Sequence, residues 1–400
     1  MNARKFIKTI PLKLYLILLG LILFSFFSND FGLVDIQKTA VILAAAIDKT
    51  DDGFSVTAQI AVPKGGNRST GGTSSVDIEA EGVTVSDCIT QIFSKTGWVP
   101  KLVFCNLLLL GEEAAKDDVI SDFNYFLRND YMNDSCFLAV CEGKAKELIS
   151  SKSALDDTSS FAIVKLFSDA AEKSGKVMPN TLKNFAVGYY CVSGSSYMPF
   201  VRANSQEGAA HGQSSSPAAA SSGSGGESAS SSEEEKIYIA EETAIFSEGK
   251  MVALLPPEQT LAFSLLKGHM ESGTFTAKDG DKLVTLSVRQ NKGKVSLDMK
   301  NAPKAELSVS VMVRLCCRGT TAPVEDISSD EVKPEILKTA KEFLEEHITA
   351  LWNTAKESGC DLFNLKRELY HSSIKKYAEW KDFLLTTVAP EIKAEVTSLK

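Results

Sequence analysis

Three pairs of adjacent carboxylates are the residues best suited to acid–base chemistry. They are Glu112-Glu113, Asp117-Asp118 and Glu345-Glu346. A general acid or base needs a carboxylate whose pKa is perturbed in a pocket and which lies within reach of the reacting group. Each pair instead falls in a segment that reads as the solvent-facing side of a helix. We therefore expect these carboxylates to be solvated, and we predict no catalytic residue.

Histidine and cysteine, the usual metal ligands, lack the spacing of a metal site, since no C-x-x-C pair and no His/Cys cluster occurs. The four histidines are His211, His269, His347 and His371. Among the eight cysteines, apolar neighbours surround Cys88, Cys105, Cys136 and Cys141, whereas Cys316 and Cys317 are adjacent in a predicted strand. Apolar surroundings favour buried free thiols, with disulfides as the alternative for an exported protein. The sequence predicts no metal and no other cofactor.

Composition and motifs argue against several functional classes. The sequence contains no P-loop, G-x-G-x-x-G, G-x-S-x-G or H-E-x-x-H motif. A net charge of −8 makes nucleic acid an unfavourable partner. The chain is 44% hydrophobic and 24% charged, as globular proteins are, and its 400 residues allow two or three domains. These features favour a protein that is not an enzyme.

The beginning of the chain resembles a membrane-targeting segment. Arg4, Lys5, Lys8 and Lys13 precede an uninterrupted apolar run, which predicts a cytoplasmic N-terminus and export of the following residues. The run rises only about 21 Å as a helix, a length that suits a signal peptide as well as a span. No small-residue cleavage site follows it, so we favour an uncleaved signal-anchor with a single transmembrane helix over a cleaved signal or a soluble helix. The predicted anchor residues are Leu14, Leu16, Ile17, Leu18, Leu19, Leu21, Ile22, Leu23, Phe24, Phe26 and Phe27.

A stretch rich in Ser, Gly and Ala divides the remaining chain at residues 203–235. Such a composition offers little to bury and predicts a disordered linker. We expect a cytoplasmic stub and signal-anchor helix at 1–30, an N-terminal domain at 34–202 and a C-terminal domain at 236–400.

The N-terminal unit reads as α/β. "QKTAVILAAAID" and "FSVTAQIAVP" flank Asp52-Gly53 and predict an opening β-hairpin. "KLVFCNLLLLG" at 101–111 reads as one buried strand. Helices are expected at 84–95 and 117–130, with a strand near 136–143 between the second of these and a further helix. The helix at 84–95 has its expected apolar face at Val85, Cys88, Ile89, Ile92 and Phe93. Alternation of helices and strands indicates an α/β unit.

The C-terminal unit reads as strands followed by helices. A strand pair with a turn at Glu248-Gly249 precedes a short helix, and alternating segments then predict antiparallel strands up to residue 319. The longest helix is expected from Pro334 to Ser358, and 391–399 reads as a closing strand. The apolar stripe of the long helix comprises Leu337, Ala340, Leu344, Ile348, Leu351 and Ala355. The overall prediction is a mixed α/β and α+β fold, whose C-terminal antiparallel sheet packs against a long helix.

Four blocks in the same order resemble the Ger(x)C family, the C-subunits of bacterial spore germinant receptors. They are Asp35–Pro63, with an Ala-x-x-Ile-Asp and Thr-x-Gln-Ile pattern; Phe126–Ile149, with a Gly-Lys-Ala-Lys helix start; Glu242–Gly268; and Lys356–Trp380, with a Gly-x-Asp-x-Phe turn. The chain departs from the family pattern at Ala46, Asn106, Asn133 and Gln259, where Gly, His, Arg and Glu are usual. It also lacks the lipoprotein cysteine that follows the signal in typical members.

The resemblance implies a non-catalytic, membrane-anchored subunit that acts in spore germination through protein contacts. Its implied partners are a large membrane subunit and a transporter-like subunit of the receptor. The bulk of the chain is expected on the outer face of the cell or spore inner membrane, with the apolar N-terminus in place of the lipid. The alternative is an exported, membrane-anchored ligand-binding protein unrelated to germination, which would need a concave pocket.

Overall fold

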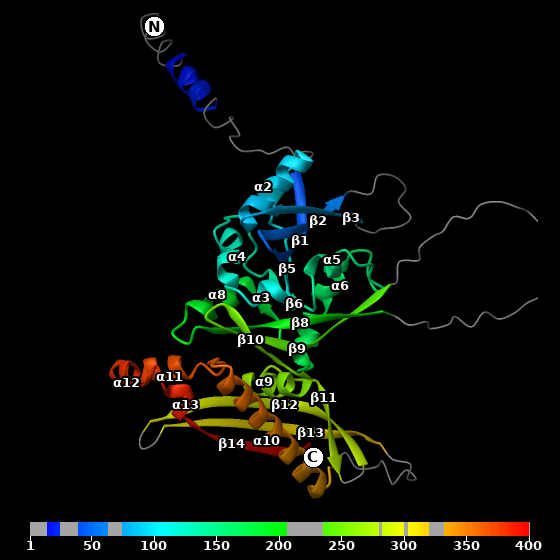
Figure 1. Cartoon of the computed structure of the whole chain (residues 1–400), viewed down its shortest axis with the longest axis vertical. Helices are drawn as coiled ribbons and strands as arrows, with labels where there is room; N and C mark the ends of the chain where they lie inside the picture. Colours follow the sequence, from blue (N-terminus) through cyan, green and yellow to red (C-terminus); the bar gives the residue numbers. More distant parts are fainter. Residues whose placement is uncertain are drawn as a thin grey trace, which may run out of the picture.

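The fold contains two β-sheets, which lie one above the other along the long axis of the molecule (Figure 1). The computed structural model describes residues 14–24, 39–62, 74–205, 235–279, 282–299, 303–319 and 332–399. Both sheets are covered by helices, so the mixed α+β class expected from the sequence is confirmed.

The first sheet has the strand order β10-β9-β8-β6-β5-β1-β2-β3. Its opening hairpin joins β1 (Thr39–Thr50) to β2 (Gly53–Val62), as the sequence predicts. The edge strand β3 (Ser74–Gly82) pairs antiparallel with β2, whereas β5 (Leu107–Gly111) and β6 (Phe137–Cys141) run parallel to β1. The short strand β7 (Asn180–Thr181) pairs with β6.

The run expected as one buried strand at 101–111 is two strands separated by a turn. The first, β4 (Val99–Lys101), pairs with Thr39–Val41 of β1, and β5 pairs with Ala44–Ile47 of the same strand. Both are parallel to β1, so residues 102–106 bulge out between two segments that line the same edge of β1. Leu102 and Cys105 point into the core, whereas Val103 and Phe104 are exposed. The prediction of an uninterrupted strand was therefore wrong.

Helices cover both faces of the first sheet, which makes it a three-layer unit. One face carries α2 (Val85–Thr96), α3 (Glu112–Ala115), α4 (Val119–Leu127) and α8 (Leu182–Tyr190). The opposite face carries α5 (Ala145–Ile149) and α6 (Ser159–Lys165). The short α7 (Asp169–Lys173) follows α6. Figure 1 shows α2, α4 and α8 on one side of this sheet and α5 and α6 on the other.

The core of the first sheet follows the alternation of its strands. Leu108 and Leu110 of β5 face α2 and α4, whereas Leu107 and Leu109 face α5 and α6. In α2, four of the five residues predicted for the apolar face are buried. Phe93, the fifth, is 42% exposed, so its prediction as a core residue was wrong.

The boundary expected near residue 235 lies between two neighbouring strands of one sheet. Strand β8 (Ser195–Ser205) pairs antiparallel with β9 (Lys236–Ser247), and β9 pairs with β10 (Lys250–Leu255). Residues 203–205 therefore belong to β8, and 236–255 belong to the first sheet and not to the second. The remainder of the expected linker, 206–234, lies outside the described residues.

The second sheet has the order β11-β12-β13-β14 and is covered on one face by helices. Its first three strands are β11 (Thr274–Asp279), β12 (Lys282–Asp298) and β13 (Lys304–Gly319), and they pair antiparallel as predicted. The last strand, β14 (Ala389–Ser398), instead pairs parallel to β13, so the expectation of a purely antiparallel sheet was wrong.

Two helices supply the cover of the second sheet. They are α9 (Pro257–Lys267), which ends at the left-handed Gly268, and the long α10 (Pro334–Glu357). The predicted stripe of α10 faces the core, with Leu344, Ile348 and Leu351 buried and Leu337 partly buried. After α10, the chain forms α11 (Leu365–Ser372), α12 (Ile374–Trp380) and α13 (Leu384–Thr387) before it enters β14.

The described part of the predicted anchor is a helix at residues 14–24. Its large apolar side chains from Leu14 to Phe24 are 40–72% exposed, and Phe26 and Phe27 lie outside the described residues. Within the described part of the chain, no helix is both long and apolar enough to cross a membrane.

Candidate functional site

Asp48, at the end of the Ala-x-x-Ile-Asp pattern in the first family block, ties strand β1 to helix α5. It is almost fully buried, and the backbone N–H groups of Ala145 and Lys146 donate to its Oδ1 and Oδ2 at 2.7 and 2.8 Å. Burial raises the pKa of Asp48, and these two hydrogen bonds partly offset that rise. A Cβ at the neighbouring Gly111 would overlap the carboxylate, so this close approach requires glycine. Asp48 therefore holds the fold together.

Asp361, in the Gly-x-Asp-x-Phe turn, likewise accepts hydrogen bonds from the first backbone N–H groups of helix α11. It is fully buried, and the backbone N–H groups of Leu365 and Lys366 donate to its two carboxylate oxygens at 2.8 Å each. Burial raises the pKa of this carboxyl group as well. The turn closes through Asn364, whose φ is +57°, a conformation that asparagine tolerates better than most residues.

The same turn also fastens the second sheet to the first. The backbone N–H of Asp361 donates to Ser195 Oγ of β8 at 3.0 Å, and Cys360 Sγ donates to the carbonyl of Phe246 in β9 at 3.3 Å. Ser247 Oγ reaches the carbonyl of Gly359 at 3.5 Å. We call the contacts of residues 359–361 with β8 and β9 the joint. Two residues beyond it, Phe363 stacks on Trp352 of α10 with ring centroids 5.4 Å apart.

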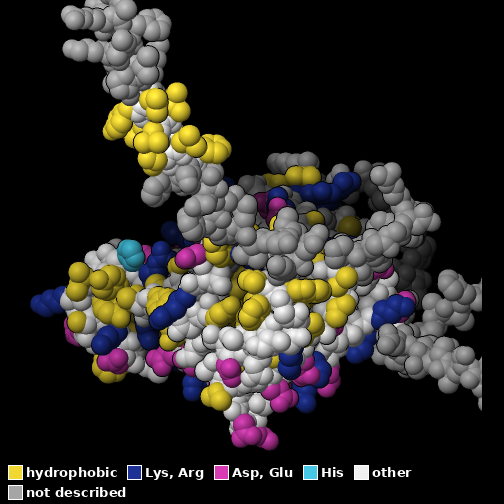
Figure 2. Space-filling model, turned by 90° about the horizontal axis from the view of Figure 1, so that it is seen from above, with side chains coloured by type: hydrophobic (Ala, Val, Ile, Leu, Met, Phe, Trp, Pro, Cys, Tyr) yellow, Lys and Arg dark blue, Asp and Glu magenta, His cyan; other side chains and the backbone are white. Residues whose placement is uncertain are grey.

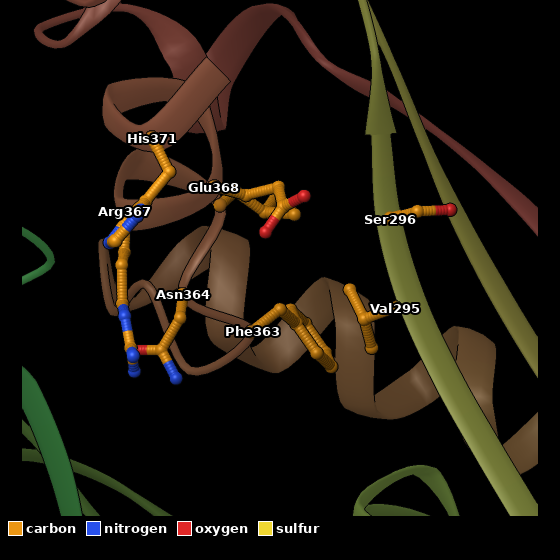
Figure 3. Close-up of a pocket in the computed structure, with 8 residues that line it drawn as sticks. Val295, Ser296, Phe363, Asn364, Arg367, Glu368 and His371 are labelled. Atoms are coloured by element: carbon orange, nitrogen blue, oxygen red, sulfur yellow. The ribbon is translucent and has the colours of Figure 1, made fainter.

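A hollow of about 290 Å³ opens beside this turn, between β12 and α11 (Figure 3). Phe363 and Val295 form its apolar wall, whereas Arg367, Glu368 and His371 contribute polar groups. In Figure 3 the side chain of Glu368 points toward the β12 side, and Arg367 lies on the far side of the helix beside Asn364. These polar groups point in different directions, which does not suit acid–base chemistry on one reacting atom.

A second hollow of about 280 Å³ lies between α4 and α8. Its lining is mainly apolar and includes Leu127, Met132 and Val187, with Lys183 and Asp134 at its polar side. Val187 and Tyr190 are well exposed beside it.

Asp122 is a buried carboxylate that the sequence reasoning missed. It is 5% exposed, and its Oδ2 has no hydrogen-bond partner. Burial raises its pKa to about 7, and the negative charge of Asp118 adds to the rise, while Lys49 opposes it. The spacing contained the signal, because Asp122 is three residues after Val119 and four before Phe126 on the apolar face of α4.

The carboxylate pairs singled out from the sequence are engaged in ordinary surface contacts. Glu112 and Glu113 both pair with Lys116, at 3.3 and 2.7 Å. Asp117 pairs with Lys49, and Asp118 accepts the backbone N–H of Ile120 as the N-cap of α4. The third pair is on α10, where Glu345 approaches the exposed Lys341 at 3.7 Å.

The described histidines lie at separate places in the fold. His269 approaches Glu172 at 2.7 Å, His347 contacts the carbonyl of Phe343, and His371 borders the first hollow; His211 lies outside the described residues. Seven cysteines are free thiols, namely Cys88, Cys105, Cys136, Cys141, Cys191, Cys316 and Cys360. No group of three His, Cys, Asp or Glu side chains in the described ranges could hold a metal ion. Burial raises the pKa of Cys88 to about 11 and of Cys360 to about 12, which keeps both as thiols near neutral pH.

Comparison with known families gives the assignment. The description "Spore germination protein N-terminal domain" matches residues 33–203, and "Spore germination B3/ GerAC like, C-terminal" matches residues 241–398. The chain belongs to the Ger(x)C family. This is the family of germinant receptor C-subunits, and the resemblance inferred from the four sequence blocks is confirmed.

Two further comparisons add little to this Ger(x)C assignment. No curated protein matches the sequence. Among solved structures, the chain is similar to "Crystal Structure of the GerBC protein", with a TM-score of 0.48 and 16% identity over 89% of this chain and 97% of that chain. The assignment rests on the two family domains.

The Ger(x)C blocks can now be placed in the structure. Asp48 of the Ala-x-x-Ile-Asp pattern and Asp361 of the Gly-x-Asp-x-Phe turn are helix caps, and neither lines a hollow. Among the departures from the family pattern, Asn106 bridges strands through its backbone, receiving Phe137 N–H and donating to the carbonyl of Leu43. Ala46 is fully buried in β1. Asp48, Asp361, Asn106 and Ala46 therefore maintain the fold, whereas other residues of the blocks, such as Asp134 and Arg367, line the two hollows.

Proposed function

We propose that this Ger(x)C protein is a non-catalytic, membrane-anchored subunit of a spore germinant receptor and acts in germination through contacts with other proteins. The observation that carries the proposal is the presence of both family domains in one chain. The roles of Asp48 and Asp361 as structural caps support a non-catalytic role. The partners proposed from the resemblance are a large membrane subunit and a transporter-like subunit.

Purification of the tagged full-length chain from spore membranes tests this role. We expect multi-spanning membrane proteins to co-purify with it, and we expect deletion of the gene to slow the response of spores to nutrients. An untagged strain is the control for co-purification. Recovery of the protein alone, together with normal germination of the deletion strain, would contradict the proposal.

The N-terminal apolar segment is the proposed anchor, with the N-terminus in the cytoplasm and the bulk on the outer face of the cell or spore inner membrane. Support comes from the wide exposure of its apolar side chains and from the positive charges before them. We predict that the mature protein retains its N-terminus and stays with membranes after a high-salt wash. N-terminal sequencing and fractionation measure this directly, and a mature sequence that begins near Asp30 would contradict it.

A ligand-binding role is the second candidate, and the hollow between β12 and α11 is the observation that favours it. Arg367 and Glu368 could recognise the carboxylate and amine of a small zwitterion. Calorimetric titration with amino acids measures such binding. Loss of heat in Arg367→Ala, but not in Lys338→Ala on the exposed face of α10, would support this role.

A further inference from the structure

An exposed group of large apolar side chains surrounds the start of the first strand. It is formed by Phe93 at 42% exposure, Trp98 at 39%, Val103 at 49%, Phe104 at 57% and Tyr131 at 64%. We call these five residues the apolar rim. Single exposed apolar residues are normal on a soluble protein, but several from neighbouring segments at one place require a reason.

The topology brings the apolar rim together. Phe93 lies in the last turn of α2, Trp98 directly precedes β4, and Val103 and Phe104 occupy the bulge between β4 and β5. Tyr131 comes from the loop after α4, and its ring lies over the ammonium group of Lys101 in β4, 4.7 Å from the centroid. Asn106, the last residue of the bulge, accepts a hydrogen bond through its carbonyl from the N–H of Phe137, the first residue of β6, so the two loops lie at the same end of these neighbouring strands.

The rim lies where the chain enters from the N-terminal helix. Thr39, the first residue of β1, pairs with Val99, which is adjacent to Trp98. The helix at residues 14–24 is connected to Thr39 by residues 25–38, a stretch that spans at most about 50 Å when fully extended. Figure 2 views the molecule from the end that carries this helix in Figure 1, and hydrophobic side chains gather over the middle of that face.

We propose that the apolar rim docks on the phospholipid surface of the membrane that holds the N-terminal helix. This inference rests on the membrane attachment proposed above. Tryptophan, tyrosine and phenylalanine suit the boundary between headgroups and acyl chains, because their rings are apolar and the first two also carry a polar group. Lys101, held over Tyr131, places a cation at the level of lipid phosphates. Asp130 lies in the same loop, so apolar content rather than net charge favours the membrane.

Docking of the rim would supply a second membrane contact. A shallow set of aromatic side chains adds binding free energy in proportion to the apolar area that it buries at the interface. It would also fix how the first sheet is oriented over the bilayer, which attachment at one point does not do. The second sheet, at the opposite end of the molecule in Figure 1, would then project away from the lipid.

Tryptophan quenching by brominated lipid tests the docking. The chain has three tryptophans, of which Trp352 is buried, so Trp380→Phe leaves Trp98 as the exposed reporter. Full-length Trp380→Phe protein is placed in vesicles of phosphatidylcholine and phosphatidylglycerol, with or without bromine on the acyl chains. We expect bromine to quench most of the Trp98 emission, and we expect little quenching in Trp98→Phe protein, which keeps Trp380.

Two matched variants separate rim docking from general adhesion. Phe104→Asp, in the Trp380→Phe background, should lose the quenching. Phe383→Asp, in the same background, should retain it, because Phe383 is equally exposed at 55% but lies between α12 and α13 near the second sheet. Equal loss in both variants would contradict the proposal.

Flotation of the same vesicles in high salt distinguishes failure of docking from failure of anchoring. Protein that floats without Trp98 quenching contradicts docking and leaves the anchor intact. Protein that does not float contradicts the anchor and the docking together. If Trp98 escapes the brominated lipid but becomes protected from aqueous iodide only when receptor membrane subunits are added, the rim binds protein and the lipid proposal is wrong.

Discussion

At the scale of single residues, Asp122 is the clearest case of a group whose charge the fold disfavours. Its pKa is raised to about 7, mainly because burial removes the carboxylate from water. The unfolded chain ionises this group near its ordinary value of about 4, so between about pH 4 and pH 7 the folded state binds the extra proton. The free energy of unfolding is therefore higher below about pH 4 than at high pH. This extra stability is lost as the pH rises toward 7, where the carboxyl group of Asp122 ionises in the folded state.

We predict that Asp122→Asn flattens this part of the pH profile and makes the protein more stable than the original chain at pH 8. The gain is on the order of 4 kcal/mol at most, since one pKa unit corresponds to about 1.4 kcal/mol. Urea unfolding at pH 5 and pH 8 measures the difference. Asp382→Asn, at an exposed position, is the control, and the same pH slope in all three proteins would contradict a buried, protonated Asp122.

At the same scale, the spacing of apolar residues predicts which residues form an apolar helix face. It does not predict which groups the polar side chains contact. The pattern of α2 correctly gave Val85, Cys88, Ile89 and Ile92 as core residues. Asp48 and Asp361 differ in how far along the chain their hydrogen-bond donors lie. Asp361 is four and five residues from its donors, whereas Asp48 is almost a hundred residues from Ala145. No local sequence pattern predicts the hydrogen bond between Asp48 and Ala145. The family resemblance singled out Asp48 but did not show its structural role.

At the scale of elements, the long helix α10 was predictable because its apolar residues recur every three or four positions over six turns. The direction of β14 was not, because the alternation of a strand is the same whether its neighbour runs parallel or antiparallel. The break between β4 and β5 was hidden for a related reason. Leu102 and Cys105 flank two exposed apolar residues, so Asn106 is the only polar residue in the bulge, and the apolar residues before it resemble a buried strand.

The same helix provides a prediction at this scale. Leu344 and Leu351 are almost completely buried against the second sheet and α9, so Leu344→Ala should destabilise the protein by about 2–5 kcal/mol. Lys341 is exposed one turn away, and Lys341→Ala should change the stability by less than about 0.5 kcal/mol. Urea unfolding of the full-length chain compares the two. Equal midpoints for both variants would show that the buried face of α10 is misassigned.

At the scale of the whole molecule, both apolar packing and the joint connect the two sheets. The core of the second sheet includes Ile245 and Leu255 from strands of the first, so apolar packing crosses between them. The joint adds hydrogen bonds that connect residues more than a hundred positions apart in the chain. The expected division at the linker missed this connection, because two segments separated by thirty residues of Ser, Gly and Ala pair as adjacent strands.

The joint therefore provides a last prediction, in which Asp361→Ala weakens the coupling between the sheets. The substitution leaves the buried N–H of Leu365 and the partly buried N–H of Lys366 without their acceptors, and an unsatisfied buried N–H costs about 1–3 kcal/mol. The turn at 359–361 should loosen, and the second sheet should unfold before the first, which keeps its own two cores. Trp352, stacked on Phe363, and Trp380, packed against the same core, report the second sheet, and Trp98 reports the first. Urea unfolding should then give two separated fluorescence transitions, with the transition of Trp352 at the lower urea concentration.

Asp382→Ala, at an exposed position outside the joint, should keep the two transitions coincident. Coincident and unshifted transitions in Asp361→Ala would mean that apolar packing alone couples the sheets, and that the family turn serves only to begin α11.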